Sequence, residues 1–270
     1  MRAFTRRVVN TFLMTCLLLV AGAAHAASPV LDRVVEQGVL RVGMSVDQPP
    51  FNMRNRKKEI VGFDVDLARA LATAMQVKLE IVEMPFGELL DALQAGRADM
   101  AISGLTITPE RTRRVSFVGP YTLSGKSILT TARIAQVVQS AEEFNDDQVR
   151  IVALEKSTSE RFVQRRLPEA FLHSIANYNE GIQMLVTGEV DAMVADLHIL
   201  KLAKLRYPDA GLGILEPQLS VEPLGIAIPG GDPQFENLLR NYLLAFEQAG
   251  LLPRLRAAWF ENNSWIATLP

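Results

Sequence analysis

A faint internal repeat is the feature that most restricts what this chain can fold into. Residues 93–101, LQAGRADMA, match residues 185–193, LVTGEVDAM, and the two segments lie 92 residues apart. In each segment a helical pattern ends at a glycine, and an aspartate three residues later opens an apolar strand. A unit that recurs at about the length of one domain predicts two similar α/β lobes.

Apolar runs alternate with helical patterns along most of the chain. Asp64 fits the N-cap of a helix over 65–75, and Asp232 followed by Pro233 predicts the start of C-terminal helices that cover the first lobe. Another helix is expected over 87–95, and strands are expected over 40–44, 78–82, 98–103, 150–154 and 192–195. Such alternation predicts an α/β protein with mainly parallel sheets.

The N-terminus has the pattern of a cleaved targeting segment. Arg2, Arg6 and Arg7 precede an uncharged run over 11–24, which ends in Ala-His-Ala at 24–26. A basic start, an apolar centre and small residues at the end are typical of a secretory signal peptide, so we expect cleavage after Ala26. The alternative is a membrane anchor, but the run is shorter than the ~20 residues that a spanning helix needs. The protein is therefore expected in the periplasm.

The composition excludes several classes of function. The chain has 28 Lys and Arg against 30 Asp and Glu, and 49% of its residues are hydrophobic, which is ordinary for a globular protein. A polybasic nucleic-acid binder is therefore excluded. The single cysteine, Cys16, can form neither an internal disulfide nor a cysteine-based metal site. His173 and His198 stand outside any metal-ligand pattern, so we expect neither a metal nor a cofactor.

Polar residues follow both repeated strands. Ser103 and Gly104 end the first strand, and Asp196 ends the second. Ligands of open α/β sheets bind beyond the carboxyl ends of the strands, so we expect these ends to face one another across a cleft. Asp196 has an alternative role as the cap of the next helix, in which case it would not contact a ligand.

Two further segments carry candidate anion-binding residues. Thr108 and Pro109 predict the start of a helix, and Arg111 in its first turn offers a planar set of donors that suits a carboxylate. Lys156 and the two hydroxyl residues after it, Ser157 and Thr158, start another helix after a strand. In both segments the alternative is an ordinary capped helix on the surface.

Together these residues resemble the polar amino-acid-binding proteins of bacterial ABC importers, the family 3 solute-binding proteins. The resemblance spans 31–260, and its motifs are GFDVDLA at 62–68, SGLTITPER at 103–111 and FVGPY at 117–121. It implies a type II periplasmic-binding-protein fold, in which two α/β lobes joined by two crossing strands close on a ligand. The expected division is a signal peptide at 1–26, one lobe at 27–119 with 222–270, and the other at 120–221.

The resemblance also implies roles for individual residues. Arg111 is expected to bind the α-carboxylate of an amino acid, and Asp196 is expected to pair with the α-ammonium group. The expected helpers of Arg111 are the backbone N–H of Thr106 and the hydroxyl or N–H of Thr158, and those of Asp196 are the Ser103 hydroxyl and the Gly104 carbonyl. The protein is expected to be a monomer that delivers its ligand to the membrane subunits of an ABC importer.

The expected pocket for the ligand side chain departs from the family pattern. Phe86 stands where an aromatic residue packs on the ligand, but Gln48 replaces another aromatic residue. Ser45 replaces the acidic residue of basic-amino-acid binders, which argues against lysine or arginine as the ligand. Lys156 replaces a glycine, and its ammonium group has two alternatives: to meet an acidic ligand side chain or to point to solvent.

An enzyme branch shares this fold. The chain also resembles cyclohexadienyl and arogenate dehydratases, at 31–42 and at 247–252. In that branch the resemblance implies a catalytic acid three residues after the strand-end aspartate, and here this position is Ile199, which cannot donate a proton. We therefore expect a binding protein rather than an enzyme. A sensor-coupled amino-acid-binding protein stays open as a further alternative.

Overall fold

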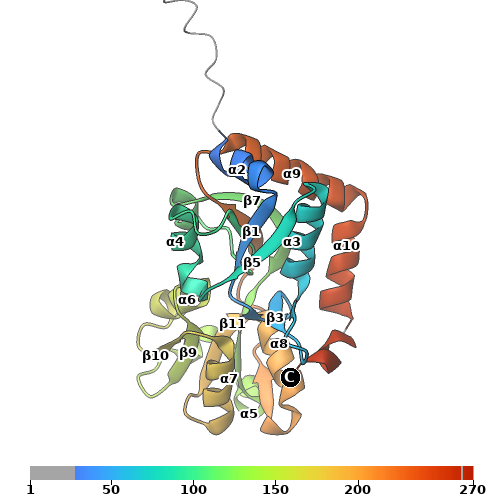
Figure 1. Cartoon of the computed structure of the whole chain (residues 1–270). Coiled ribbons are helices and arrows are strands. Elements are labelled where there is room, and N and C mark those ends of the chain that lie inside the picture. Colours follow the sequence, from blue (N-terminus) through green and yellow to red (C-terminus); the bar gives the residue numbers. More distant parts are fainter. Residues whose placement is uncertain (1–27, 263, 270) are drawn as a thin grey trace, which may run out of the picture.

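The computed structural model describes residues 28–262 and 264–269. These residues form two lobes, one built around each of two five-stranded sheets (Figure 1). The predicted signal peptide, 1–26, lies outside the described residues. Within the described part, no helix has the length and the apolar character that a membrane span requires.

The first lobe contains the sheet β5-β1-β6-β13-β7. Strand β1 (Val39–Met44) pairs in parallel with β5 (Lys78–Glu83) and with β6 (Met100–Ala101), whereas β13 (Glu222–Ile228) and β7 (Ser116–Ser124) are antiparallel to each other. A small sheet joins β2 (Asp47–Gln48), β3 (Asn52–Arg54) and β4 (Ile60–Val61). The helices of this lobe are α2 (Pro29–Gln37), α3 (Phe63–Ala74), α4 (Leu89–Gln94), α9 (Pro233–Gln248) and α10 (Leu251–Arg256).

The second lobe contains the sheet β10-β9-β11-β8-β12. Strand β9 (Arg150–Leu154) pairs in parallel with β10 (Phe171–Ile175) and β11 (Ala192–Asp196). Strand β8 (Lys126–Thr131) is antiparallel to β11 and to β12 (Leu212–Ile214). Its helices are α5 (Ala132–Val137), α6 (Thr158–Arg166), α7 (Tyr178–Thr187) and α8 (Leu197–Arg206).

Both sheets are mixed, and not mainly parallel as predicted. The chain leaves the first lobe along β7 and enters the second as β8, and it returns after β12 along β13. These crossing segments add antiparallel strands to each sheet. The alternation of helices and strands along the sequence does not show in which direction a strand runs, so it could not predict them. On the basis of the two sheets we propose that the first lobe comprises 27–119 with 222–270 and that the second comprises 120–221.

The repeated aspartates have the same structural role in the two lobes. Asp99 accepts hydrogen bonds from the backbone N–H of Arg41 (2.7 Å) and from its guanidinium (2.8 Å). Asp191 accepts from the backbone N–H and the Nε of Arg150, both at 2.9 Å. In each case an aspartate before the strand fixes an arginine on the neighbouring strand, so the repeat in sequence is a repeat in fold.

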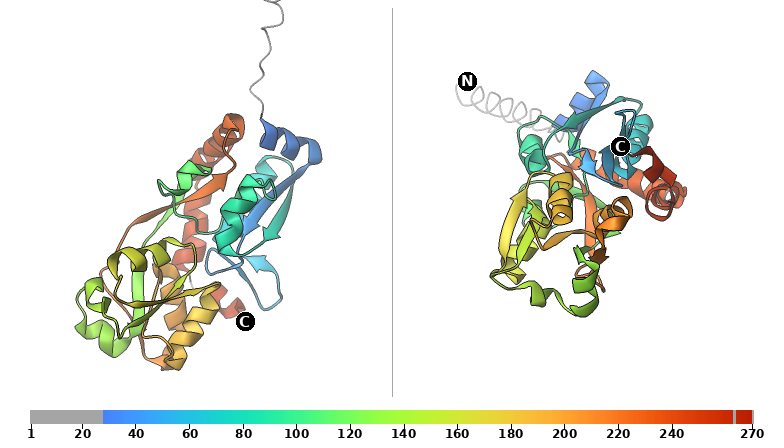
Figure 2. Two further views of the ribbon diagram at one scale, coloured as in Figure 1. Left: turned by 90° about the vertical axis from the view of Figure 1, so that its left-hand side faces the viewer. Right: turned by 90° about the horizontal axis from the view of Figure 1, so that it is seen from below.

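The C-terminal helices cover the first lobe, as predicted. The Asp232 carboxylate caps α9 by accepting from the Phe235 N–H (2.9 Å), and Phe235 and Leu239 pack in the core of that lobe. The chain then reaches the second lobe, where Leu269 packs against Leu202 of α8. Figure 2 shows this dark red segment beside α8.

Candidate ligand-binding cleft

Arg111 lies buried where the two lobes meet. The Thr108 hydroxyl accepts a hydrogen bond from the Arg111 N–H (3.2 Å), but the helix expected here is only a single 3-10 turn, Arg111–Arg113. The segment is too short for a longer helix because β7 begins at Ser116. A helix dipole therefore adds nothing at this point, and the capacity to bind an anion rests on the guanidinium itself.

The guanidinium of Arg111 bridges the lobes. It donates to the carbonyl oxygen of Thr106 (3.0 Å) and to that of Lys156 (3.3 Å), and its Cζ lies 5.5 Å from the ring centroid of Phe86. Burial and the charge of Arg161 lower its pKa to about 10, so it is charged at neutral pH. These two bonds use two of the five N–H groups, which leaves donors for a carboxylate.

Asp196 ends β11 and is 7% exposed. It takes the N-cap position of α8, but its carboxylate makes no capping hydrogen bond, so the capping alternative is not supported. Burial, and next the charge of Glu222, raise its pKa to about 6, against the opposing effects of Lys126 and Arg111. A buried carboxylate of this kind suits a cationic group of a ligand.

Ser103, Ser45 and Gln48 form one polar network in the first lobe. The Ser103 hydroxyl accepts from the Ser45 N–H (3.1 Å) and from the Asn52 side-chain amide (3.2 Å). The Gln48 amide donates to the Ser45 hydroxyl (3.0 Å), and Gln48 is buried. The structure thus places these predicted residues together, and Asn52, which sequence reasoning missed, joins them.

Asp64 positions the strand end instead of capping a helix. Helix α3 begins at Phe63 with Gly62 at its N-cap, so the predicted cap lies two residues too late. The Asp64 carboxylate turns inward and accepts from the Gly104 N–H (2.9 Å) and from the Asn52 amide (3.1 Å). Burial raises its pKa to about 6.

Thr106 and Thr158 come together across the lobes, but around a carboxylate that sequence reasoning missed. The Glu222 Oε2 accepts from the Thr106 hydroxyl (2.7 Å) and from the Thr158 hydroxyl (3.0 Å). Its other oxygen pairs with the ammonium group of Lys126, which is 1% exposed. Each hydroxyl has one proton, so in this arrangement only the backbone N–H groups of these threonines are free to donate to a ligand carboxylate. The available signal was a charged residue at the first position of two strands, Lys126 in β8 and Glu222 in β13.

Lys156 approaches the cleft through its backbone. Its φ of +54° lies in the left-handed region, which explains why a glycine suits this position. Its carbonyl oxygen accepts from Arg111, whereas its side chain is exposed and lies over Gly87 of the first lobe. An ion pair between Arg161 and Glu110 (2.6 Å) also spans the lobes. The cleft is therefore closed in this structure.

Asp47 is a further carboxyl group at the interface, partly buried, and sequence reasoning missed it. It lies on β2, which contacts α7. Burial raises its pKa to about 6, opposed by hydrogen bonding to Ser45 and to the backbone of Tyr178.

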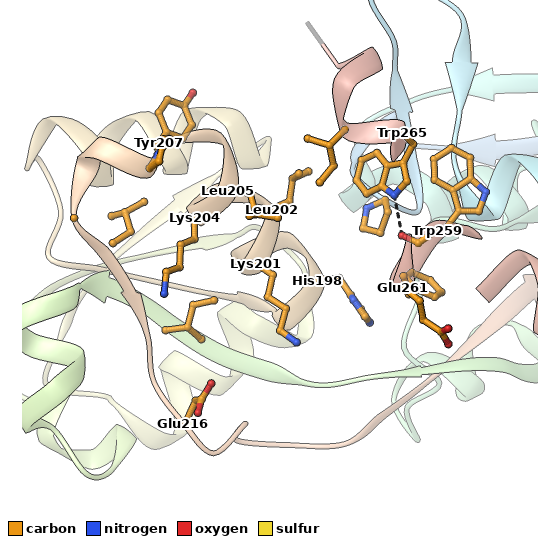
Figure 3. Close-up of a pocket in the computed structure, with 17 residues that line it drawn as sticks. His198, Lys201, Leu202, Lys204, Leu205, Tyr207, Glu216, Trp259, Glu261 and Trp265 are labelled. Carbon is orange, nitrogen blue, oxygen red and sulfur yellow. Dashed lines mark hydrogen bonds between the residues drawn. The ribbon is translucent and has the colours of Figure 1, made fainter. Parts of the chain in front are cut away.

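A separate hollow of about 690 Å³ lies between α8 and the C-terminal segment (Figure 3). None of the predicted site residues lines it. His198 forms part of its wall and packs against Phe260, with ring centroids 4.6 Å apart, and burial lowers the pKa of His198 to about 4. Within the described residues, no three His, Cys, Asp or Glu side chains gather as metal ligands.

Comparison with known sequences gives a family match over most of the chain. Residues 40–262 match the family of bacterial extracellular solute-binding proteins, family 3. A cyclohexadienyl dehydratase from Pseudomonas aeruginosa is 30% identical over 253 residues, which cover 92% of each chain. The ABC transporter arginine-binding protein 1 of Escherichia coli (strain K12) is 28% identical over 225 residues, 82% of this chain and 90% of the relative.

Solved structures show the same architecture. An ancestral amino-acid-binding protein, a precursor of cyclohexadienyl dehydratase, has a TM-score of 0.79 at 35% identity and covers 85% of this chain and 99% of its own. A putative ABC-transporter binding component from Wolinella succinogenes DSM 1740, complexed with lysine, has a TM-score of 0.82 at 33% identity, with coverage of 86% and 99%. These likenesses confirm the predicted type II periplasmic-binding-protein fold.

The prediction that the chain is not an enzyme is contradicted by these relatives. One is a dehydratase of 30% identity, and one structural neighbour is a dehydratase precursor. The prediction had rested on Ile199, and in the structure this side chain is 2% exposed and packs among apolar residues. Its identity therefore does not decide whether another group in the cleft can donate a proton.

Proposed function

The chain belongs to the bacterial extracellular solute-binding proteins, family 3, and from this premise we propose that it captures an amino acid between its lobes for an ABC importer. The observation that carries the proposal is the pair of buried charges, Arg111 from the first lobe and Asp196 from the second. Each acts electrostatically on the other. An amino-acid zwitterion has a carboxylate to bind Arg111 and an ammonium group to bind Asp196.

Closure follows from the placement of the two charges. The ligand α-carboxylate binds the free donors of Arg111 and the backbone N–H groups of Thr106 and Thr158. The α-ammonium group binds Asp196, with the Gly104 carbonyl as a helper. The Ser103 hydroxyl, the other predicted helper, must first give up the Ser45 N–H or the Asn52 amide, because these two donors use both of its lone pairs. A ligand that touches both lobes has its highest affinity for the closed state and shifts the population towards it.

The remaining predictions about the site and its partners belong to the same proposal. Ser45, Gln48, Phe86 and Lys156 form the pocket for the ligand side chain. The protein is exported by a signal peptide cut after Ala26, acts in the periplasm as a monomer, and meets the membrane subunits of an importer. N-terminal sequencing of periplasmic protein should find Ala27 first, and a membrane-bound species that begins at Met1 would contradict export.

A thermal-shift screen of the common amino acids tests the proposed function. A ligand at 100 times its Kd adds ~2.7 kcal/mol to the free energy of unfolding. We expect at least one amino acid to raise the melting temperature of the unaltered protein and to leave the Arg111→Ala variant unchanged. If no amino acid stabilises the folded, unaltered protein, the proposed function is wrong.

A second candidate function is favoured by one observation on the relatives. The dehydratase match spans 92% of both chains, and the Asp196 pKa of about 6 suits a group that donates a proton near neutral pH. Loss of water together with carbon dioxide from a carboxylated cyclohexadienol creates an aromatic ring, which ultraviolet absorbance detects. Turnover that grows with protein concentration and disappears in Asp196→Asn would support this candidate, and a flat signal beside tight amino-acid binding would reject it.

A further inference from the structure

A hollow of about 790 Å³ opens between the lobes beside the crossing strands. One wall is the 108–113 turn of the first lobe, and the other is α6 of the second. Four arginines line it: Arg113, Arg161, Arg165 and Arg166. Lys126, Thr158 and Glu222 line it as well, so a solute in this hollow can reach the buried ion pair.

The ion pair in this hollow belongs to a larger cluster of charges. The pKa of Asp196 responds to Lys126, Glu222 and Arg111, and that of Arg111 responds to Arg161 and then to Glu222, Asp196 and Glu110. Three of these groups are cations and three are anions, so the cluster has no net charge. Lys126 and Glu222 satisfy each other, which leaves Arg111 and Asp196 for the ligand.

The surroundings of Glu222 hold it in this place. One oxygen accepts from the hydroxyls of Thr106 and Thr158, one from each lobe. The other oxygen takes the Lys126 ammonium group and the Ser220 hydroxyl (3.3 Å). The side chains of Lys126 and Glu222 are only 2% and 12% exposed. Removal of either one therefore leaves the other as a buried charge with no ion-pair partner and little water to solvate it.

We propose that the Lys126–Glu222 pair determines which ligand charge the cleft accepts. The intact pair is neutral, so by itself it favours neither an anionic nor a cationic ligand side chain. Without Glu222, the buried Lys126 attracts a ligand that brings an additional carboxylate. Without Lys126, the buried Glu222 attracts a ligand that brings an additional cation. This inference rests on the proposed function, in that the ligand is an amino acid.

Isosteric ligands measure this preference. Glutamate and glutamine have nearly the same shape and differ in charge. Lysine and norleucine have the same four-carbon side chain, and only lysine has a terminal ammonium group. We expect Glu222→Gln to raise the affinity for glutamate relative to glutamine by at least tenfold over the ratio in the unaltered protein. Lys126→Met is expected to raise the affinity for lysine relative to norleucine by a similar factor. The nearby carboxyl group of Asp47 also affects the affinity for charged ligands. It is present in every variant, so its effect cancels when each ratio is compared with that of the unaltered protein.

Two control variants separate specificity from structure. The double variant Lys126→Met/Glu222→Gln has no unpaired charge, so both ratios should return to within about threefold of the original values. Glu142→Gln removes the partner of Arg166, an exposed arginine that lines the same hollow. A screened surface charge has little effect, so its ratios should stay within about twofold of the original.

A purely structural pair gives a different result. If Lys126 and Glu222 only join the lobes, the single variants lose affinity for all four ligands by the same factor, and the ratios stay constant, which overturns the proposal. If Glu222→Gln does not fold, Lys126→Met must still shift its ratio in the opposite sense. If no amino acid binds the unaltered protein, the proposed function fails and this inference with it; constant ratios with tight binding reject this inference alone.

Discussion

Replacing Asp196 by asparagine separates a ligand anchor from a helix cap. Asparagine keeps the shape of the side chain and removes its charge. In the structure the Asp196 carboxylate makes no capping hydrogen bond, although the residue precedes α8. We therefore expect Asp196→Asn to weaken amino-acid binding strongly and to leave the unliganded protein at least as stable as before.

The magnitude for stability follows from the pKa of Asp196. Burial raises this pKa from 3.8 to about 6, so the folded protein binds the proton more tightly than the unfolded chain does. The free energy of unfolding therefore falls as the pH rises from about 4 to about 6, and the loss persists at higher pH. A shift of one pKa unit corresponds to ~1.4 kcal/mol. The substitution Asp196→Asn should therefore raise the free energy of unfolding by at most roughly 3 kcal/mol at neutral pH.

The magnitude for binding has the opposite sign. Removal of one partner from a buried charged pair costs ~3–5 kcal/mol, because the other charge is left without compensation. Each ~1.4 kcal/mol is a factor of ten in Kd. Calorimetry with the best ligand from the thermal-shift screen should therefore find the Kd of Asp196→Asn raised by roughly a hundredfold or more.

Asp232 supplies the matched control, because it is a buried aspartate that does cap a helix. Its carboxylate accepts from the Phe235 N–H and the Val30 N–H, both at 2.9 Å. Asp232→Ala should lose ~0.5–2 kcal/mol of stability without a change in Kd. The reasoning on Asp196 is refuted if Asp196→Asn behaves like this control, or if its Kd stays within about threefold of the parent value, a difference below ~1 kcal/mol.

Three further outcomes are expected. Arg111→Lys keeps the charge but loses the planar donors, so titration calorimetry should find at least about tenfold weaker binding. The Kd should rise below about pH 6, by at most about tenfold per pH unit, because protonated Asp196 cannot pair with the ammonium group; an equally steep profile in Asp196→Asn would assign the effect elsewhere. Gly62→Ala places a Cβ 2.1 Å from the Phe51 carbonyl oxygen at a φ of +142°, so urea unfolding should show a loss above ~2 kcal/mol, and an unchanged midpoint would contradict the close approach.

The sequence predicted those parts of the fold that depend on nearby residues. The aspartates of the repeat, Asp99 and Asp191, each mark a strand, because each fixes an arginine on the strand beside it. The Asp232 cap was equally local. By contrast, the pattern at Thr108 predicted a helix where the structure has one 3-10 turn, since the position of β7 limits its length.

The candidate site was only partly predictable because it depends on distant contacts. Lys126 and Glu222 are 96 residues apart and meet only because they begin β8 and β13, the strands on either side of the crossing between the lobes. Asp64 resembled a cap in sequence, yet its carboxylate holds the Gly104 N–H, 40 residues away. Arg111 and Asp196 were candidates because one follows and the other ends a strand of its own lobe, and the resemblance then assigned their roles; these roles stay predictions until binding is measured.

Closure of this cleft and capture of a ligand are coupled through the cost of buried charge. The lobes already touch through the Arg111–Lys156 hydrogen bond and the Arg161–Glu110 ion pair, so the closed state does not depend wholly on a ligand. Among the described residues, closure gives Asp196 only the partial compensation of the Lys126 and Arg111 charges, and its ionised form is still unfavourable in the buried site. A ligand ammonium group removes that cost only while the carboxylate is buried. Its differential affinity for the closed state therefore grows with the burial that closure creates, and this difference is what shifts the population.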